Sequence, residues 1–131
     1  MSIDFRISRK LANNYVQADV SSKNITRYYK LPENEADSFY QDYKEYDKKT
    51  RISATILDIT CSLGGAILGI SAAKYLKAKM LIQMLVGLTM AFAGNIISTV
   101  ITARDMQKNE NALLEKHHAE RIFYDNKINI L

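Results

Sequence analysis

Two long apolar runs dominate the pattern of hydrophobic and polar positions along the chain. Ile52–Ala73 contains one charged residue, Asp58, and Met80–Ala103 contains none. As helices these runs would extend about 33 and 36 Å, against about 30 Å for the hydrocarbon core of a bilayer. Because lipid offers the backbone no hydrogen-bonding partner, segments that cross it in this way must be helical. The pattern therefore predicts two transmembrane helices.

A soluble alternative is a hairpin buried inside a helical bundle, as in a pore-forming toxin before insertion. In a bundle of 131 residues nearly every helix needs a polar stripe facing water. The second run offers only Gln83, Asn95 and scattered hydroxyl groups for such a stripe. The membrane interpretation is therefore preferred.

The short connection between the runs, residues 74–79, predicts that the two helices are antiparallel neighbours. It carries three lysines, whereas six cations flank the outer ends of the runs: Lys44, Lys48, Lys49, Arg51, Arg104 and Lys108. The positive-inside rule then favours both chain ends on the cytoplasmic or matrix-like side. We expect an integral protein of a bacterial or organelle inner membrane. No cleavable signal peptide is expected, because the first apolar run begins only at residue 52.

The polar segments around the runs are predicted to be helical arms. Pro32 with the acidic residues after it predicts a helix start, so one helix is expected through residues 32–51 into the first run. Residues 1–31 are predicted to form a polar arm, with a helix over Asp4–Ala18 and a break at Ser21–Asn24. Residues 104–131 are predicted to continue the second run as a polar helix. The predicted fold is therefore all-α, a two-pass hairpin with both arms on the same side.

Aromatic and basic side chains are expected at the membrane boundaries. Tyr40, Tyr43 and Tyr46 crowd the turns before the first run, where they either pack on a neighbouring arm or form an interfacial aromatic belt. The lysines of the connection, Lys74, Lys77 and Lys79, are the other expected interfacial residues.

Small residues recur along one face of each run at alternating steps of four and three. The candidate packing residues are Ser62, Gly65, Gly69 and Ala72 in the first run, and Gly87, Ala91, Gly94 and Ser98 in the second. Small faces let helices approach closely, which provides packing where lipid removes the hydrophobic driving force. The faces either close this hairpin on itself or join another subunit.

Asp58 is the candidate functional residue within the runs, because an intramembrane carboxylate is costly unless it is partnered. An antiparallel pairing places Asn95, Ser98 and Thr99 at a similar depth. Such a polar layer would line an ion or proton path, clamp a protonated Asp58, or be completed by a cation from a partner.

Charge and composition exclude several other classes of function. Three of the four net positive charges lie in residues 74–79, so the basic balance does not indicate nucleic-acid binding. One cysteine excludes a disulfide framework, and no catalytic or phosphate-binding motif is present. His117 and His118 are adjacent and project apart on a helix, which excludes shared metal binding. We expect no enzyme activity and no cofactor or metal, only lipids around the spans.

The layout resembles the SLATT two-span effector domains of bacterial nucleotide-triggered defence systems. The residues that carry the resemblance are TRISATILDITCSLGGAILGI before the connection and NALLEKHHAERIFYDNKI after the second run, within residues 38–128. It implies self-assembly into a membrane-damaging pore. In outline the hairpin is also similar to small mitochondrial inner-membrane organising proteins, although their dense glycine ladders are missing here.

Two functions follow as hypotheses. The first is a non-catalytic structural or assembly subunit of a larger membrane complex, whose partners are lipids and other subunits. The second is a homo-oligomeric pore, whose partners are copies of the same chain and whose lining includes the Asp58 layer.

Overall fold

The computed structural model describes residues 3–23 and 25–124. The chain forms two compact units, one of Met1–Tyr46 with Glu110–Leu131 and one of Asp47–Asn109. We call them the sheet unit and the hairpin unit. Both chain ends belong to the sheet unit, so the polar arms on either side of the apolar runs fold together.

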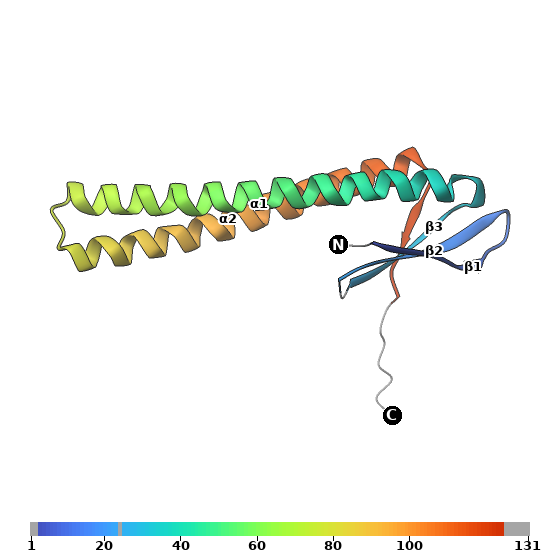
Figure 1. Ribbon diagram of the computed structural model, residues 1–131, viewed down its shortest axis with the longest axis horizontal. Coiled ribbons are helices and arrows are strands. Elements are labelled where there is room, and N and C mark those ends of the chain that lie inside the picture. Colours follow the sequence, from blue (N-terminus) through green and yellow to red (C-terminus); the bar gives the residue numbers. More distant parts are fainter. Residues whose placement is uncertain (1–2, 24, 125–131) are drawn as a thin grey trace, which may run out of the picture. The chain divides into compact units, whose positions relative to one another are not determined.

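The sheet unit contains a four-stranded antiparallel sheet with the order β1-β2-β3-β4 (Figure 1). Its strands are β1 (Asp4–Lys10), β2 (Tyr15–Ser22), β3 (Ile25–Pro32) and β4 (Glu120–Ile122). The all-α prediction is therefore wrong for the arms, and the helix expected over Asp4–Ala18 does not form. The break expected near residues 21–24 is instead the turn between β2 and β3, where Lys23 has a φ of 57°.

A period of two along the chain explains why β2 is a strand. Val16, Ala18 and Val20 alternate with polar residues and are all buried on the same face. The turn before them suits asparagine, which tolerates the left-handed conformation. Asn13 and Asn14 have φ values of 61° and 60°, and the amide of Tyr15 donates to the carbonyl of Ala12. The two strands therefore form a tight hairpin.

Two long helices follow the strands. A 3-10 turn, η1 (Glu33–Glu35), precedes α1 (Ala36–Tyr75), and α2 (Met80–Lys116) begins after residues 76–79. A continuous helix from near Pro32 through the first apolar run is thus confirmed, with its α-helical part starting at Ala36. Within the hairpin unit α1 and α2 run antiparallel (Figure 1).

The helix predicted over residues 104–131 ends early. α2 stops at Lys116, His118 has a φ of 50°, and the amide of Ala119 donates to the carbonyl of Leu114 at 2.8 Å. β4 then pairs with β3, with Arg121 opposite Tyr29. A left-handed residue just after the last turn is a common helix stop, here made without glycine. Residues 125–131 lie outside the described residues.

One hydrophobic core holds the sheet unit together. It joins the inner face of the sheet to the first turns of α1 and the last turns of α2, through Val16, Ala18, Val20, Tyr29, Leu31, Ala36, Phe39, Tyr43, Leu113 and Ala119. Tyr29 and Phe39 are fully buried, and their ring centroids lie 5.3 Å apart. This core brings together segments that are more than 60 residues apart in the chain, such as Phe39 and Leu113.

Candidate functional site

The small residues of the two apolar runs line the contact between α1 and α2 in the hairpin unit. A Cβ atom added to Gly65 would overlap the carbonyl of Met90, and one added to Gly94 would overlap the carbonyl of Cys61. At Gly69 the added atom would lie 2.8 Å from the carbonyl oxygen of Val86. The backbones therefore approach so closely that only glycine fits. We call Gly65, Gly69, Gly87 and Gly94 the glycine seam.

The structure places the other predicted packing residues in and around this seam. Ala91 lies beside Gly65, and Ser62 lies beside Gly94. Ala72 is exposed, and its neighbour Ala73 is the buried residue instead, with 4% exposure. The contact face therefore steps four residues from Gly69 to Ala73, where a step of three to Ala72 was predicted. The helical period of 3.6 residues moves the contact face in this way along the chain.

Asp58 has one defined polar contact in the hairpin unit. The Ser98 hydroxyl donates to Oδ1 of Asp58 at 2.9 Å and also lies 2.8 Å from the carbonyl of Asn95. Ser98 is 2% exposed, whereas Asp58 is half-buried. The side chains of Asn95 and Thr99 are exposed, so they do not join this contact. Of the predicted polar layer, the structure brings together Asp58 and Ser98 only.

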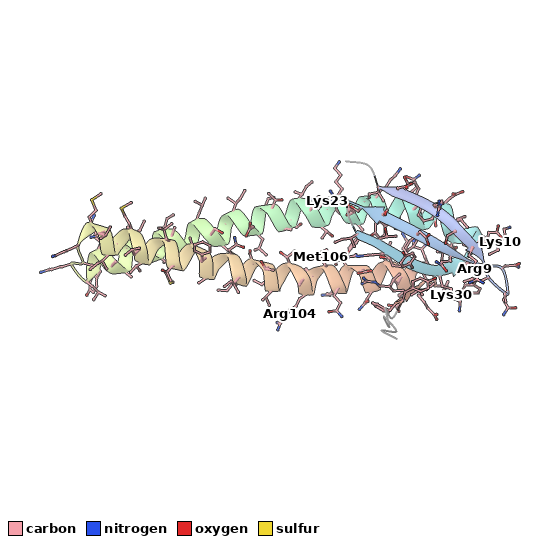
Figure 2. All side chains as sticks on the ribbon, turned by 90° about the horizontal axis from the view of Figure 1, so that it is seen from below. Arg9, Lys10, Lys23, Lys30, Arg104 and Met106 are labelled. Atoms are coloured by element: carbon pink, nitrogen blue, oxygen red, sulfur yellow. The ribbon has the colours of Figure 1, made fainter. Side chains whose placement is uncertain are left out.

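Large apolar side chains cover the outside of the hairpin unit. Ile56, Leu63, Ile67, Leu88 and Phe92 are all more than half exposed, and Figure 2 shows side chains projecting outward along both helices. Both helices are long and apolar enough to cross a membrane. In their most apolar windows only 11% and 17% of the residues are buried, unlike the core helices of a soluble protein.

The residues predicted to be interfacial divide into two groups. Lys74, Lys77 and Lys79 are exposed at the hairpin turn. Tyr43 is not interfacial but a core residue with 3% exposure, and Tyr46 packs half-buried against the same core. Tyr40 stacks on Phe5 of β1, with centroids 4.8 Å apart. The packing alternative is the one that the structure shows for these tyrosines.

A buried carboxylate, Glu110, forms the polar centre of the sheet unit. Its Oε1 accepts a hydrogen bond from the Tyr29 hydroxyl at 2.8 Å, and its Oε2 lies 3.4 Å from both Arg27 and Arg121. The side chain of Glu110 is 8% exposed. Burial, together with the neighbouring Tyr43 and Glu110, raises the pKa of Tyr29, so this phenol stays protonated and donates.

A second polar cluster surrounds His117 at the end of α2. Its Nδ1 lies 2.9 Å from Glu35 and 3.2 Å from the Ser38 hydroxyl, and its Nε2 lies 2.8 Å from Asp42. Each ring nitrogen of His117 therefore faces a carboxylate. His117 is 3% exposed, so it packs inside the sheet unit. His118 points to solvent.

Acid should weaken the His117 cluster. The hydrogen bond with His117 holds the pKa of Glu35 below its ordinary value, and hydrogen bonds from Lys116 and His117 do the same for Asp42. A carboxylate with a lowered folded-state pKa contributes stability that is present above its ordinary pKa, about 4, and is lost as the pH falls through the lowered value. We expect the thermal midpoint of the sheet unit to fall over this range, and to fall less in Asp42→Asn. Asp37→Asn, an exposed carboxylate on the same helix, is the control and should leave the acid dependence unchanged.

Within residues 3–23 and 25–124, no group of three His, Cys, Asp or Glu side chains is placed to hold a metal ion. The cluster of Glu110, Arg27 and Arg121 was not predicted from the sequence. The one signal was Glu110 itself, a charge on the apolar face that Met106 and Leu113 define.

Comparison with protein-family models, with curated proteins and with solved structures gives no match for this chain. The resemblance to SLATT-type domains therefore stays a prediction.

Proposed function

We propose that this chain is a non-catalytic integral membrane protein that serves as a structural subunit of a larger membrane complex. In this proposal the hairpin unit crosses the bilayer twice, and the sheet unit stands in water and contacts other subunits. The observation that carries the proposal is the exposed apolar surface of the hairpin unit. A continuous surface of this kind is incompatible with a monomer in water, because exposed apolar patches on soluble monomers are limited to a few hundred Å².

The glycine seam supports a hairpin that forms within one chain. Gly65, Gly69, Gly87 and Gly94 all contact the opposite helix of the same chain, so this face is already used. Contacts with other subunits would then involve other surfaces. The sheet unit is suited to that role, since it combines described residues from before and after the two apolar runs and β1 is an edge strand.

Extraction in a mild detergent followed by mass measurement tests this proposal. A structural subunit should copurify with several different chains in a fixed ratio. A chain that stays monomeric and soluble without detergent would contradict both the membrane location and the subunit role.

A homo-oligomeric pore is the second candidate, favoured by the exposed polar side chains of Asn95 and Thr99. The Thr99 hydroxyl already donates to the carbonyl of Asn95, but in lipid the side-chain amide of Asn95 needs polar partners, which a ring of identical chains around a water-filled path would supply. A ring of identical chains in the mass measurement, together with depolarisation of the expressing cell, would support the pore instead of the subunit.

The Asp58→Asn variant separates the roles of this carboxylate. An asparagine oxygen still accepts the Ser98 hydroxyl, so a hydrogen-bonded clamp predicts an unchanged assembly. If Asp58 instead pairs with a cation of another subunit, the variant should lose its partners in the detergent extract. Thr60→Val, which removes an exposed hydroxyl nearby on α1, is the matched control.

A further inference from the structure

A group of cations lies at the end of the hairpin unit that is opposite the turn between α1 and α2. Three of them carry the argument, Lys48 of α1 together with Arg104 and Lys108 of α2, and all three are exposed. Figure 2 shows Arg104 projecting away from α2. Arg104 and Lys108 are one helical turn apart, so they share a face of that helix. We call these three residues the basic collar.

The two helices bring the basic collar to one end of the hairpin unit. Asp58 contacts Ser98 across this unit, which fixes the register of α1 against α2. Lys48 lies ten residues before Asp58, and Lys108 lies ten residues after Ser98. At about 1.5 Å per residue, both cations lie about 15 Å from this contact along the helix axes. Because the helices are antiparallel, Lys48 and Lys108 are at the same level.

This level matches the headgroup layer of a bilayer. Lys48 lies four residues before the apolar run that begins at Ile52, and Lys108 lies five residues after the run that ends at Ala103. These separations correspond to about 6 and 8 Å along a helix. The headgroup region extends about 5–8 Å on each side of the hydrocarbon core. In a hairpin that crosses the bilayer, as proposed above, the basic collar therefore lies among the lipid headgroups.

Nearby carboxylates do not balance the charge at this level. Arg51 pairs with Asp47 at 2.8 Å, and Asp105 is the other carboxylate beside the collar. With Lys49 and Arg51 added to the collar, five cations stand against these two carboxylates. In the part of the chain that the structure describes, no carboxylate pairs with a member of the collar. The surface therefore has a net positive charge where it would meet headgroup phosphates.

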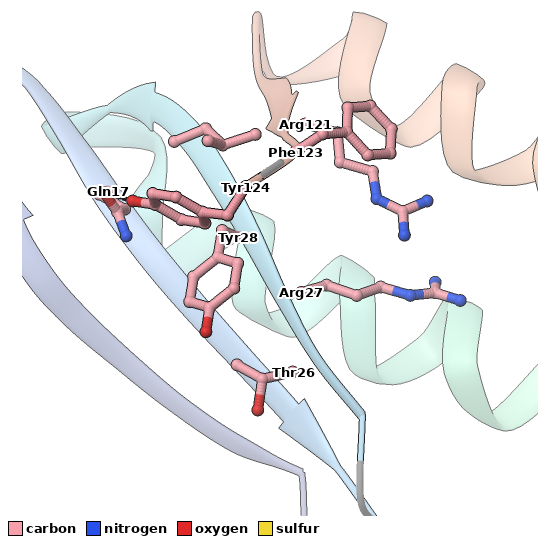
Figure 3. A pocket seen from close by; sticks show the side chains of 8 residues that line it. Gln17, Thr26, Arg27, Tyr28, Arg121, Phe123 and Tyr124 are labelled. Carbon is pink, nitrogen blue, oxygen red and sulfur yellow. Dashed lines mark hydrogen bonds between the residues drawn. The ribbon is translucent and has the colours of Figure 1, made fainter. Parts of the chain in front are cut away.

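The arginines of the sheet unit do not offer a comparable surface. Arg27 and Arg121 direct their guanidinium groups to the side of the sheet that the helices cover (Figure 3). Each lies 3.4 Å from Oε2 of the buried Glu110. An anion would have to displace this carboxylate, whereas at the basic collar it meets exposed cations.

We propose that the basic collar binds the headgroups of anionic phospholipids such as phosphatidylglycerol. Lysine and arginine form charge-assisted hydrogen bonds with phosphate oxygens. Clusters of these residues directly beside a membrane span favour anionic lipids over zwitterionic ones. Phosphatidylcholine is the weaker ligand because its own ammonium group balances its phosphate. This inference rests on the proposed membrane crossing, and it assigns the bound lipids to the leaflet next to residues 47 and 109.

Quenching of a single tryptophan by brominated lipids tests the proposal, because the chain has no tryptophan of its own. Ile52→Trp places this reporter next to the collar, at a side chain that is 51% exposed. The full chain is reconstituted in vesicles that contain brominated phosphatidylglycerol or brominated phosphatidylcholine. At this reporter the binding of phosphatidylglycerol should be favoured about fivefold or more, which is the effect of about one cation at an anionic surface.

Two triple variants in the Ile52→Trp background identify the residues that cause the preference. The first combines Lys48→Gln, Arg104→Gln and Lys108→Gln, and in it the preference should fall below about twofold. The matched control removes the same charge from the hairpin turn and combines Lys74→Gln, Lys77→Gln and Lys79→Gln. It should keep the full preference at this reporter.

The outcomes separate this inference from the proposed function. Equal quenching by the two lipids in the Ile52→Trp chain, or an equal preference in the two triple variants, would overturn the lipid site alone. The absence of quenching by either lipid would overturn the membrane crossing as well.

Discussion

Glu110→Gln should lower the free energy of unfolding of the sheet unit by about 2–3 kcal/mol. The substitution keeps the size of the side chain and its acceptor for the Tyr29 hydroxyl. It removes the only charge that the structure places between Arg27 and Arg121 in the described chain. The expected loss is smaller than the 3–5 kcal/mol of a fully buried pair, because both arginines retain contact with water.

Hydrogen exchange of the β2 and β3 amides measures this effect directly, since these strands open only when the sheet unit unfolds. Glu115→Gln provides the matched control, being an exposed carboxylate on the same helix five residues along. Its exchange should equal that of the unaltered chain. If Glu110→Gln exchanged no faster than Glu115→Gln, Glu110 would not be the charge that holds the sheet unit together.

Gly65→Val should force α1 and α2 apart in the hairpin unit. The first added carbon overlaps the backbone carbonyl of Met90, which cannot rotate away as a side chain can. Overpacking of this kind costs about 1–3 kcal/mol or more, which is a large part of the stability of a helix pair. Gly94→Val should act in the same way, because its added carbon overlaps the Cys61 carbonyl.

The neighbouring glycine offers an exact control for this prediction. A Cβ atom at Gly64 meets nothing within 4 Å, so Gly64→Val changes helix propensity equally without entering the seam. Disulfide formation between Asp58→Cys and Ser98→Cys, in a Cys61→Ala background, reports helix pairing. The yield should fall strongly with Gly65→Val and stay unchanged with Gly64→Val. Equal yields in the two variants would show that the seam does not hold the helices together.

Much of the hairpin unit could be predicted from the sequence, because long apolar runs leave few alternatives. The predicted connection at residues 74–79 includes the turn observed at residues 76–79. An antiparallel hairpin closed by this connection requires Gly65 to lie beside Ala91, and the structure places it there. The small residues also repeat with the helical period, which identifies the contact face. Of the predicted packing residues, only Ala72 is wrong, since its neighbour Ala73 is the buried residue. Steps that alternate strictly between four and three residues average 3.5, and this drifts from the helical period of 3.6.

The sheet unit was missed because its first strand imitates a helix. Ile3, Ile7 and Leu11 recur every four residues, which favours a helical interpretation of residues 4–18. The alternation of Val16, Ala18 and Val20 was the opposing signal, and it has the period of a strand. Neither glycine nor proline marks the turn before it, where Asn13 and Asn14 adopt the left-handed conformation.

The Glu110 cluster lay beyond sequence reasoning for a different reason. It depends on β4, a strand of three residues that follows a helix without a glycine stop. Glu110 lies 83 residues from Arg27, and only the pairing of β4 with β3 adds Arg121 to the same carboxylate. Such long-range pairing leaves no local pattern in the chain.

The sidedness of two single-cysteine variants tests most directly whether the hairpin unit crosses a membrane twice. With Cys61→Ala as background, Lys79→Cys marks the hairpin turn and Arg9→Cys marks the sheet unit. Both positions are exposed. A membrane-impermeant maleimide should label only one of the two from outside intact spheroplasts, and only the other in inverted vesicles. Labelling of both positions from the same side would contradict the account.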